Sequence, residues 1–423
     1  MRNWIGAGLA LALLSGTAQA GESGDHLADA LYSGSLGELA STSTDACDAG
    51  EGDACFTLGL DAVINAFETL AQNLYRHGAV VPDSSAFGLL TGMGAPSAPS
   101  TNPDPEPLTY DLLREHLDAF TAQLDNAATY MKLAGEGTQF VIAIEPLRVR
   151  IDLDGDGERG ETETLGTLLE NAGAGFDVPE PSGKAQSKGQ QPAVPQLVIG
   201  FDNADAYWFA GYSNITALPF DFLLAHDFTE FYNSFLHRVF PNAGLPMGNL
   251  ARGGSLVIDA DTDAYFADVI AAIHTASFPV ADRDRLAGVL ERASAVTALS
   301  RQNWEAILAE TDDNFELVPS PTQTSLVPDQ EVTEEIVSAW HQALDQIDRI
   351  IAGDLLVPHW RFTKGVNLKT YFETAQKTDL VLLFTGHDAL PFLDDGPIAG
   401  ADDFRELNHV MGDDWPLFAI WFN

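Results

Sequence analysis

Acidic residues at fixed spacing form the part of the sequence best suited to chemistry. Asp152, Asp154 and Asp156 alternate along the chain, Gly157 follows directly, and Glu163 lies further on. Calcium is a hard cation that takes six to eight oxygen ligands. Alternate Asp side chains can point to one centre, and a Gly permits the sharp turn that brings a distal Glu round. The spacing therefore predicts a calcium-binding loop.

Residues 152–163 resemble the twelve-residue calcium loop of the EF-hand family. The resemblance implies that the ligands are the side chains of Asp152, Asp154, Asp156 and Glu163, the backbone carbonyl of Glu158, and a water at Gly160. Position 8, which is usually apolar so that two loops can pair, is Arg159, and the sequence holds no partner loop. We therefore expect calcium in a structural role and not in a sensor that opens on binding. A solvated acidic turn is the alternative.

A second acidic run begins in the same way but lacks the rest of the pattern. Asp259, Asp261 and Asp263 alternate, yet Ala264 stands where the Gly is needed and Ile270 where the distal carboxylate is needed. We predict that these carboxylates cap the helix that follows.

Three residues in the second half of the chain are weaker candidates for a site. His226 and Glu230 lie four apart, with His237 nearby, so they could bind zinc or act as an acid–base pair. The sequence has no His-Glu-x-x-His motif, and in so acidic a chain a carboxylate often falls four residues from a His. The aromatic residues around them are typical of a pocket lining or of the core of a large helical domain.

The elements that must position these residues are mainly helical. Phe56 to Leu74 and Leu113 to Met131 each carry apolar residues at alternating steps of three and four, which predicts two helices that pack as an antiparallel pair. Leu147 to Leu153 alternates and predicts a strand that enters the calcium loop. Pro219 is expected to divide a second helical stretch. The predicted fold class is mainly α with a minor β component, bundle-like, with a strand–loop–helix calcium loop.

The N-terminus carries an export signal. Arg2, an apolar run from Ile5 to Leu14 and the small-residue site ending at Ala20 make residues 1–20 a signal peptide. In an oxidising compartment Cys47 and Cys55 are expected to form a disulfide. The stretch between Gly21 and Gly52 is rich in small and polar residues and is expected to be loosely ordered. We predict a periplasmic or secreted protein.

Composition divides the chain further and excludes some partners. We expect a helical part over residues 21–176, a linker or long surface loop over 177–195, and a larger aromatic-rich part over 196–423.

The 423 residues include 62 Asp and Glu but 21 Lys and Arg, a formal net charge of −41. That charge repels phosphates and anionic lipids, so we expect no nucleic-acid partner, and no later segment is long and apolar enough to span a membrane.

Segments near the C-terminus are similar to a group of uncharacterised exported bacterial proteins. They include the stretch from His359 to Phe362, the stretch from Ala389 to Leu393, and the terminal run from Phe418 to Asn423. This group implies no activity. We therefore expect an exported calcium-binding protein of the bacterial envelope that binds a small-molecule or protein ligand, or alternatively a periplasmic hydrolase with a carboxylate or His site in the second part.

Overall fold

The computed structural model describes residues 22–80, 102–152, 155–171, 197–248, 256–311, 313, 316–324 and 331–411. The expected signal peptide and the expected linker fall outside these residues. The N-terminal half contains α1 (Glu22–Ser33), α2 (Leu36–Asp48), α3 (Gly52–Arg76), α5 (Tyr110–Glu136), β1 (Val141–Ile144), the 3-10 turn η1 (Pro146–Arg148) and α6 (Leu165–Asn171). The rest begins with β2 (Ile199–Asp202), α7 (Asn203–Leu224), α8 (Thr229–Phe235), η2 (Leu236–Arg238), α9 (Ala260–Thr275), β3 (Ser277–Pro279), α10 (Arg283–Ala309) and α11 (Glu334–Ala352).

The C-terminal elements are short. They are β4 (Gly365–Val366), α12 (Leu368–Thr374), β5 (Lys377–Asp379), α13 (Leu380–Thr385), η3 (Leu390–Phe392), β6 (Leu393–Asp394), η4 (Ala401–Phe404) and α14 (Arg405–Met411). The described strands form three two-stranded antiparallel sheets, β1–β2, β3–β5 and β4–β6. The prediction of a mainly α fold with a minor β component is confirmed.

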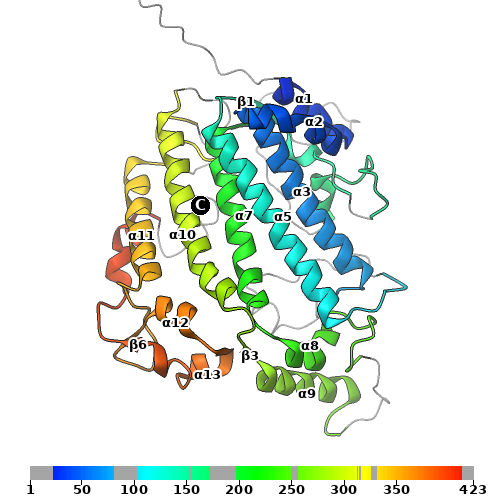
Figure 1. Ribbon diagram of the computed structural model, residues 1–423, viewed down its shortest axis with the longest axis vertical. Coiled ribbons are helices and arrows are strands. Elements are labelled where there is room, and N and C mark those ends of the chain that lie inside the picture. The colour runs from blue at the N-terminus through cyan, green and yellow to red at the C-terminus, as the bar shows by residue number, and fades with distance from the viewer. Residues whose placement is uncertain are drawn as a thin grey trace, which may run out of the picture.

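Long helices lie side by side in one row, in the order α3, α5, α7, α10 (Figure 1). The predicted antiparallel pair corresponds to α3 and α5, which run along each other over most of their length. Gly59 permits this closeness, because a Cβ at that position would lie 2.8 Å from the Met131 side chain. α5 in turn packs on α7, and β1 pairs with β2, so the segments on the two sides of the expected linker share one layer.

Several local expectations were wrong. The residues after Gly21 are not loosely ordered: α1 and α2 pack on α3 and bury Leu27, Leu31 and Leu36. Pro219 lies inside one continuous helix, α7. The predicted strand before the acidic loop is replaced by η1, since Pro146 begins a 3-10 turn there, and by a single bridge from Arg150 to Thr164.

The disulfide prediction is confirmed. Cys47 at the end of α2 and Cys55 in the first turn of α3 are bonded, and both are buried in the core beneath α1 and β1. By the chain-entropy estimate, a loop of this length stabilises the fold by roughly 2.5 kcal/mol. The bridge therefore fixes the turn between α2 and α3.

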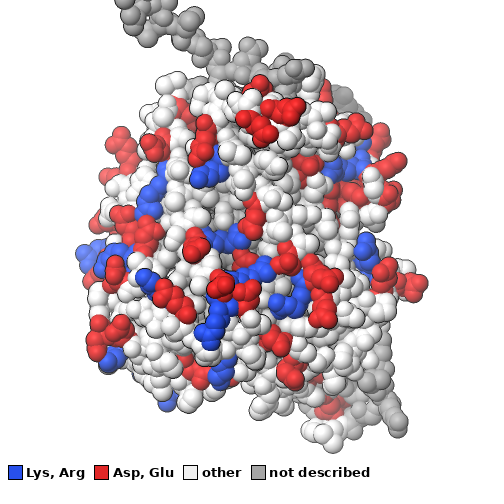
Figure 2. Space-filling view, viewed as in Figure 1, with Lys and Arg blue, Asp and Glu red and all other residues white. Residues whose placement is uncertain are grey.

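One described helix, α3, is long and apolar enough to cross a membrane by length and composition alone. The same composition is typical of a core helix, and α3 packs against α2 and α5 while burying the polar side chains of Asp53 and Glu68. Acidic side chains are scattered over the face of the molecule seen in Figure 2, with basic ones between them mainly across its middle. The exterior therefore carries the charge excess that the composition indicated.

Candidate metal sites and an acidic cavity

The loop 152–163 is closed at its base by backbone hydrogen bonds. Ile151 N donates to the Glu163 carbonyl over 2.9 Å, and Leu165 N donates to the Val149 carbonyl over 2.9 Å. The segment entering the loop and the start of α6 are therefore held together, as a loop that encircles an ion requires. Leu153 and Asp154 lie outside the described residues.

Inside the loop the chain folds around the first acidic side chain. The two carboxylate oxygens of Asp152 accept hydrogen bonds from Gly155 N over 2.8 Å and from Gly157 N over 3.1 Å. Both glycines have positive φ, +76° and +90°, a conformation that costs other residues energy. Gly157 is thus needed for the turn that the spacing predicted.

The carboxylates of Asp156 and Glu163 also accept backbone hydrogen bonds within the loop. Glu158 N donates to Asp156 Oδ1 over 2.8 Å, and Gly160 N donates to Glu163 Oε2 over 2.7 Å. Backbone N–H groups therefore hold the carboxylates of Asp152, Asp156 and Glu163 in place. Carboxylate oxygens are the ligands that a hard cation such as Ca²⁺ prefers. Among the described residues, however, Asp152, Asp156 and Glu163 do not place one oxygen each within 4.8 Å of the others.

Arg159, which departs from the EF-hand pattern, attaches the loop to helix α3. Its Nε and Nη2 atoms bind the two carboxylate oxygens of Glu68, each over 2.8 Å, and both side chains are nearly buried. The hydrogen bonds that Arg159 donates to the Glu68 carboxylate raise the pKa of Arg159. Glu68 also accepts from Asp152 N over 2.7 Å, and Gln72 donates to the Asp152 carbonyl over 2.9 Å. Position 8 thus contacts a helix where an EF-hand pair would contact a second loop.

The weaker candidates have separate partners. His226 is buried; its Nδ1 donates to the Phe222 carbonyl over 2.6 Å and its Nε2 lies 2.7 Å from Thr378 Oγ1. Burial lowers the pKa of His226. Glu230 is exposed on α8, and His237 lies 3.1 Å from Asp268 on α9. These contacts place His226 in a polar network of the core.

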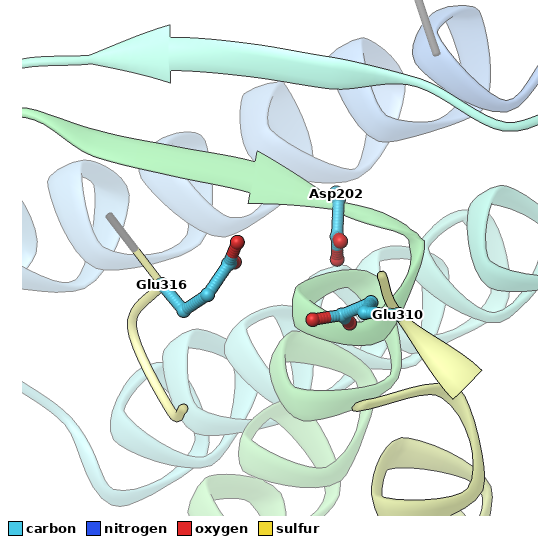
Figure 3. A group of neighbouring side chains, drawn as sticks. All are labelled: Asp202, Glu310 and Glu316. Carbon is cyan, nitrogen blue, oxygen red and sulfur yellow. The ribbon is translucent and has the colours of Figure 1, made fainter. Parts of the chain in front are cut away.

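Sequence reasoning missed a cluster of three carboxylates. Asp202 ends β2, Glu310 directly follows α10, and Glu316 lies in the segment after it (Figure 3). One oxygen of each lies within 4.8 Å of the others; Asp202 and Glu316 are buried, and Glu310 is half-buried. Asp202 also caps α7, accepting from Ala204 N and Asp205 N. Asp202 is more than 100 residues away in sequence from Glu310 and Glu316, so sequence spacing alone gives no sign that the three side chains meet.

The cluster holds protons unless a cation compensates its charge. Burial raises the pKa of Glu310 to about 9, and the charge of Asp202 adds to this effect. Burial and the Asp202 charge also raise the pKa of Asp205 well above its ordinary range. Three carboxylates this close cannot all ionise without a positive charge among them. The cluster can therefore share protons or bind a divalent cation.

A cavity of about 400 Å³ adjoins the cluster. Asp202 and Glu310 line it together with mostly polar side chains, among them Gln139, Tyr207 and Gln302. Titratable groups with shifted pKa values at a polar cavity are typical of active sites. Comparisons with protein families, with curated proteins and with solved structures found no match to this chain.

Proposed function

We propose that the protein is an exported, calcium-stabilised binding protein of the bacterial envelope, with Ca²⁺ held by the loop 152–163. One observation carries the proposal: the loop is closed at its base, and its backbone N–H groups donate hydrogen bonds to the carboxylates of Asp152, Asp156 and Glu163. Such an arrangement concentrates negative charge that a calcium ion would neutralise.

The ion would be bound by the side chains of Asp152, Asp154, Asp156 and Glu163, by the Glu158 carbonyl, and through a water at Gly160. Its role would be structural. Because Arg159 and Gln72 already attach the loop to α3, binding would fix the segment between β1 and α6 against the helical row. Ion binding would not expose an apolar groove, because Arg159 at position 8 of the loop forms an ion pair with Glu68.

An exposed aromatic surface supports the binding role. Trp360 and Phe384 are 69% and 71% exposed, and their rings are 6.2 Å apart. Trp360 Nε1 donates to the Phe384 carbonyl over 2.8 Å, and Arg361 donates to the Thr385 carbonyl over 3.0 Å. Large apolar side chains held rigid in solvent are typical of recognition surfaces. With Arg361 beside them, they fit a ligand that has an apolar face and an anionic group.

Thermal unfolding with and without a chelator tests the calcium proposal. We expect Ca²⁺ to raise the unfolding midpoint and a chelator to reverse the shift, because an ion that binds only the folded chain stabilises it by mass action. Glu163→Gln should remove most of the shift. Glu158→Gln is the matched control, since residue 158 would ligate through its carbonyl and should keep the shift. An unchanged midpoint on chelation contradicts the proposal.

A hydrolase is the second candidate, and the cavity beside Asp202 and Glu310 favours it. A carboxylic acid that stays protonated near neutral pH next to an ionised one can act as acid and base in glycoside hydrolysis. If so, activity on a panel of chromogenic glycosides should be lost in Glu310→Gln and kept in Glu305→Gln, which changes another side chain at the same cavity. Activity that survives Glu310→Gln contradicts this role.

A further inference from the structure

Two histidines meet where α3 and α5 lie side by side. His77 directly follows α3, and His116 lies in the second turn of α5. Their Nε2 atoms are 3.2 Å apart, and their ring centroids are 5.4 Å apart. Neither residue belongs to the calcium loop or to the acidic cluster.

His77 is oriented by a contact that fixes its tautomer. The side chain is 2% exposed, and its Nδ1 lies 3.0 Å from the backbone carbonyl of Glu106. A carbonyl oxygen only accepts, so Nδ1 carries the proton. In the neutral ring the lone pair is therefore on Nε2, the atom that faces His116. Histidines that bind metals generally donate their other ring N–H to a carbonyl or carboxylate in this way.

The backbone around His77 holds this contact rigidly. Glu106 N donates to the Arg76 carbonyl over 3.0 Å, so both backbone groups of Glu106 are bound to the end of α3. Gly78 has φ +65°, and a Cβ there would lie 2.8 Å from Pro105 Cβ. The turn after α3 therefore requires glycine at position 78. The close approach of Gly78 to Pro105 keeps the neighbouring Glu106 carbonyl in contact with His77.

The separation of the two nitrogens suits a shared metal ion. Two imidazoles on one tetrahedral Zn²⁺, with Zn–N bonds of about 2.0–2.1 Å, have their nitrogens about 3.3 Å apart. The observed 3.2 Å is close to this distance. We propose that His77 and His116 form a binding site for a borderline divalent metal of the Zn²⁺ class, at the junction of α3 and α5. His116 is half-buried, so water could occupy the remaining coordination positions.

The site differs in chemistry from the acidic ones. Imidazole suits Zn²⁺, Cu²⁺ and Ni²⁺, whereas carboxylate and carbonyl oxygens suit Ca²⁺ and Mg²⁺. Without a metal, His116 Nε2–H donates to the lone pair on His77 Nε2. With a metal, both Nε2 lone pairs bind the ion, and the proton of His116 is on its Nδ1 instead. The two helices would then be joined through a bound metal.

The test uses the purified chain without a polyhistidine tag, in excess Ca²⁺ so that carboxylate sites are filled. Zn²⁺ is titrated by calorimetry, and Cu²⁺ bound at the same site is examined by electron paramagnetic resonance. We expect one strong site, nitrogen couplings from two imidazoles, and a higher unfolding midpoint with Zn²⁺. His116→Gln should weaken Zn²⁺ binding at least tenfold and leave one coupled imidazole.

The matched control is His387→Gln, because His387 is 75% exposed and lies on another part of the chain. It should bind Zn²⁺ like the unchanged protein. His116→Gln keeps a polar side chain at a half-buried position of α5, so it should leave the circular dichroism spectrum unchanged. A hydrogen-bonded pair with no metal role would give no strong site, or equal Zn²⁺ affinity in His116→Gln, and either result overturns the proposal.

Discussion

At the end of α10 the Glu310 carboxyl group lies in an environment that disfavours its charge. It faces Asp202 and Glu316, and its Oε2 accepts a hydrogen bond from Gln323 over 2.8 Å. Burial and the neighbouring charges raise its pKa to about 9. The folded chain therefore keeps a proton near neutral pH that the unfolded chain loses above the ordinary value of 4.5.

This difference predicts a pH dependence of stability. Between pH 4.5 and about pH 9 the folded state binds more protons than the unfolded state, so the free energy of unfolding should fall as the pH rises. Glu310→Gln, which cannot ionise, should remove part of this slope and be the more stable protein at pH 8. Urea unfolding of both proteins from pH 6 to 9 measures it. Equal slopes would show that Glu310 does not hold the proton.

Local spacing predicts contacts only between residues close in the chain. The turn at Gly157 and the cap at Asp259, which accepts from Thr262 N over 2.9 Å, follow from neighbouring residue types. The cluster of Asp202, Glu310 and Glu316 carried no such signal, because β2 and the segment after α10 meet only in the folded chain. The sequence shows that Arg159 departs from the EF-hand pattern, but its partner Glu68 lies on helix α3, far away along the chain.

At the scale of elements, apolar periodicity predicted α3 and α5, since each buries one face. It could not predict α1 and α2, where small and polar residues are held by the packing of Leu27, Leu31 and Leu36. The short apolar run from Leu380 to Thr385 is the helix α13, capped by Asp379, which accepts a hydrogen bond from Leu382 N. Short apolar runs do not distinguish the two structures without their tertiary contacts.

A polar ladder joins the helices α5, α7 and α10. Asp221 on α7 accepts from Arg285 Nε over 2.8 Å and from Arg292 Nε over 2.7 Å. The same arginines bind Asp118 and Asp125 on α5 over 2.6 and 2.7 Å. Both pairs are spaced by seven residues, two helical turns, so each ladder pair lies on one face of its helix.

Asp221 should be the energetic centre of this ladder. Asp221→Asn leaves two nearly buried guanidinium groups without their shared carboxylate, which should cost about 3 kcal/mol of unfolding free energy. Asp118→Asn and Asp125→Asn are the controls; these side chains are mostly exposed and each should cost under about 1 kcal/mol. Urea unfolding gives all three values. A loss at Asp221 no larger than at Asp118 would contradict the assignment.

The whole molecule has a formal net charge of −41, in which the basic partners of the ion pairs are already counted. Acidic side chains are spread over the visible face, and the basic ones lie among them, mainly across its middle (Figure 2). Repulsion among the acidic side chains opposes the compact state, and salt screens it over a Debye length of about 8 Å at physiological ionic strength. The effect of Ca²⁺ would differ from that of salt, because Ca²⁺ would bind at one site, the loop 152–163, and its effect would stop increasing once that site is full.

Sodium chloride should therefore stabilise the protein at a fixed free Ca²⁺ concentration. We expect the thermal midpoint to rise steadily as NaCl increases from about 0.01 to 0.5 M, since the Debye length shortens from about 30 Å to a few Å over this range. KCl should give the same curve, because screening depends on ionic strength. The shift should persist in Glu163→Gln, which separates it from the calcium effect. If NaCl lowers the midpoint, the paired arginines and not the unpaired acids dominate the electrostatics of the fold.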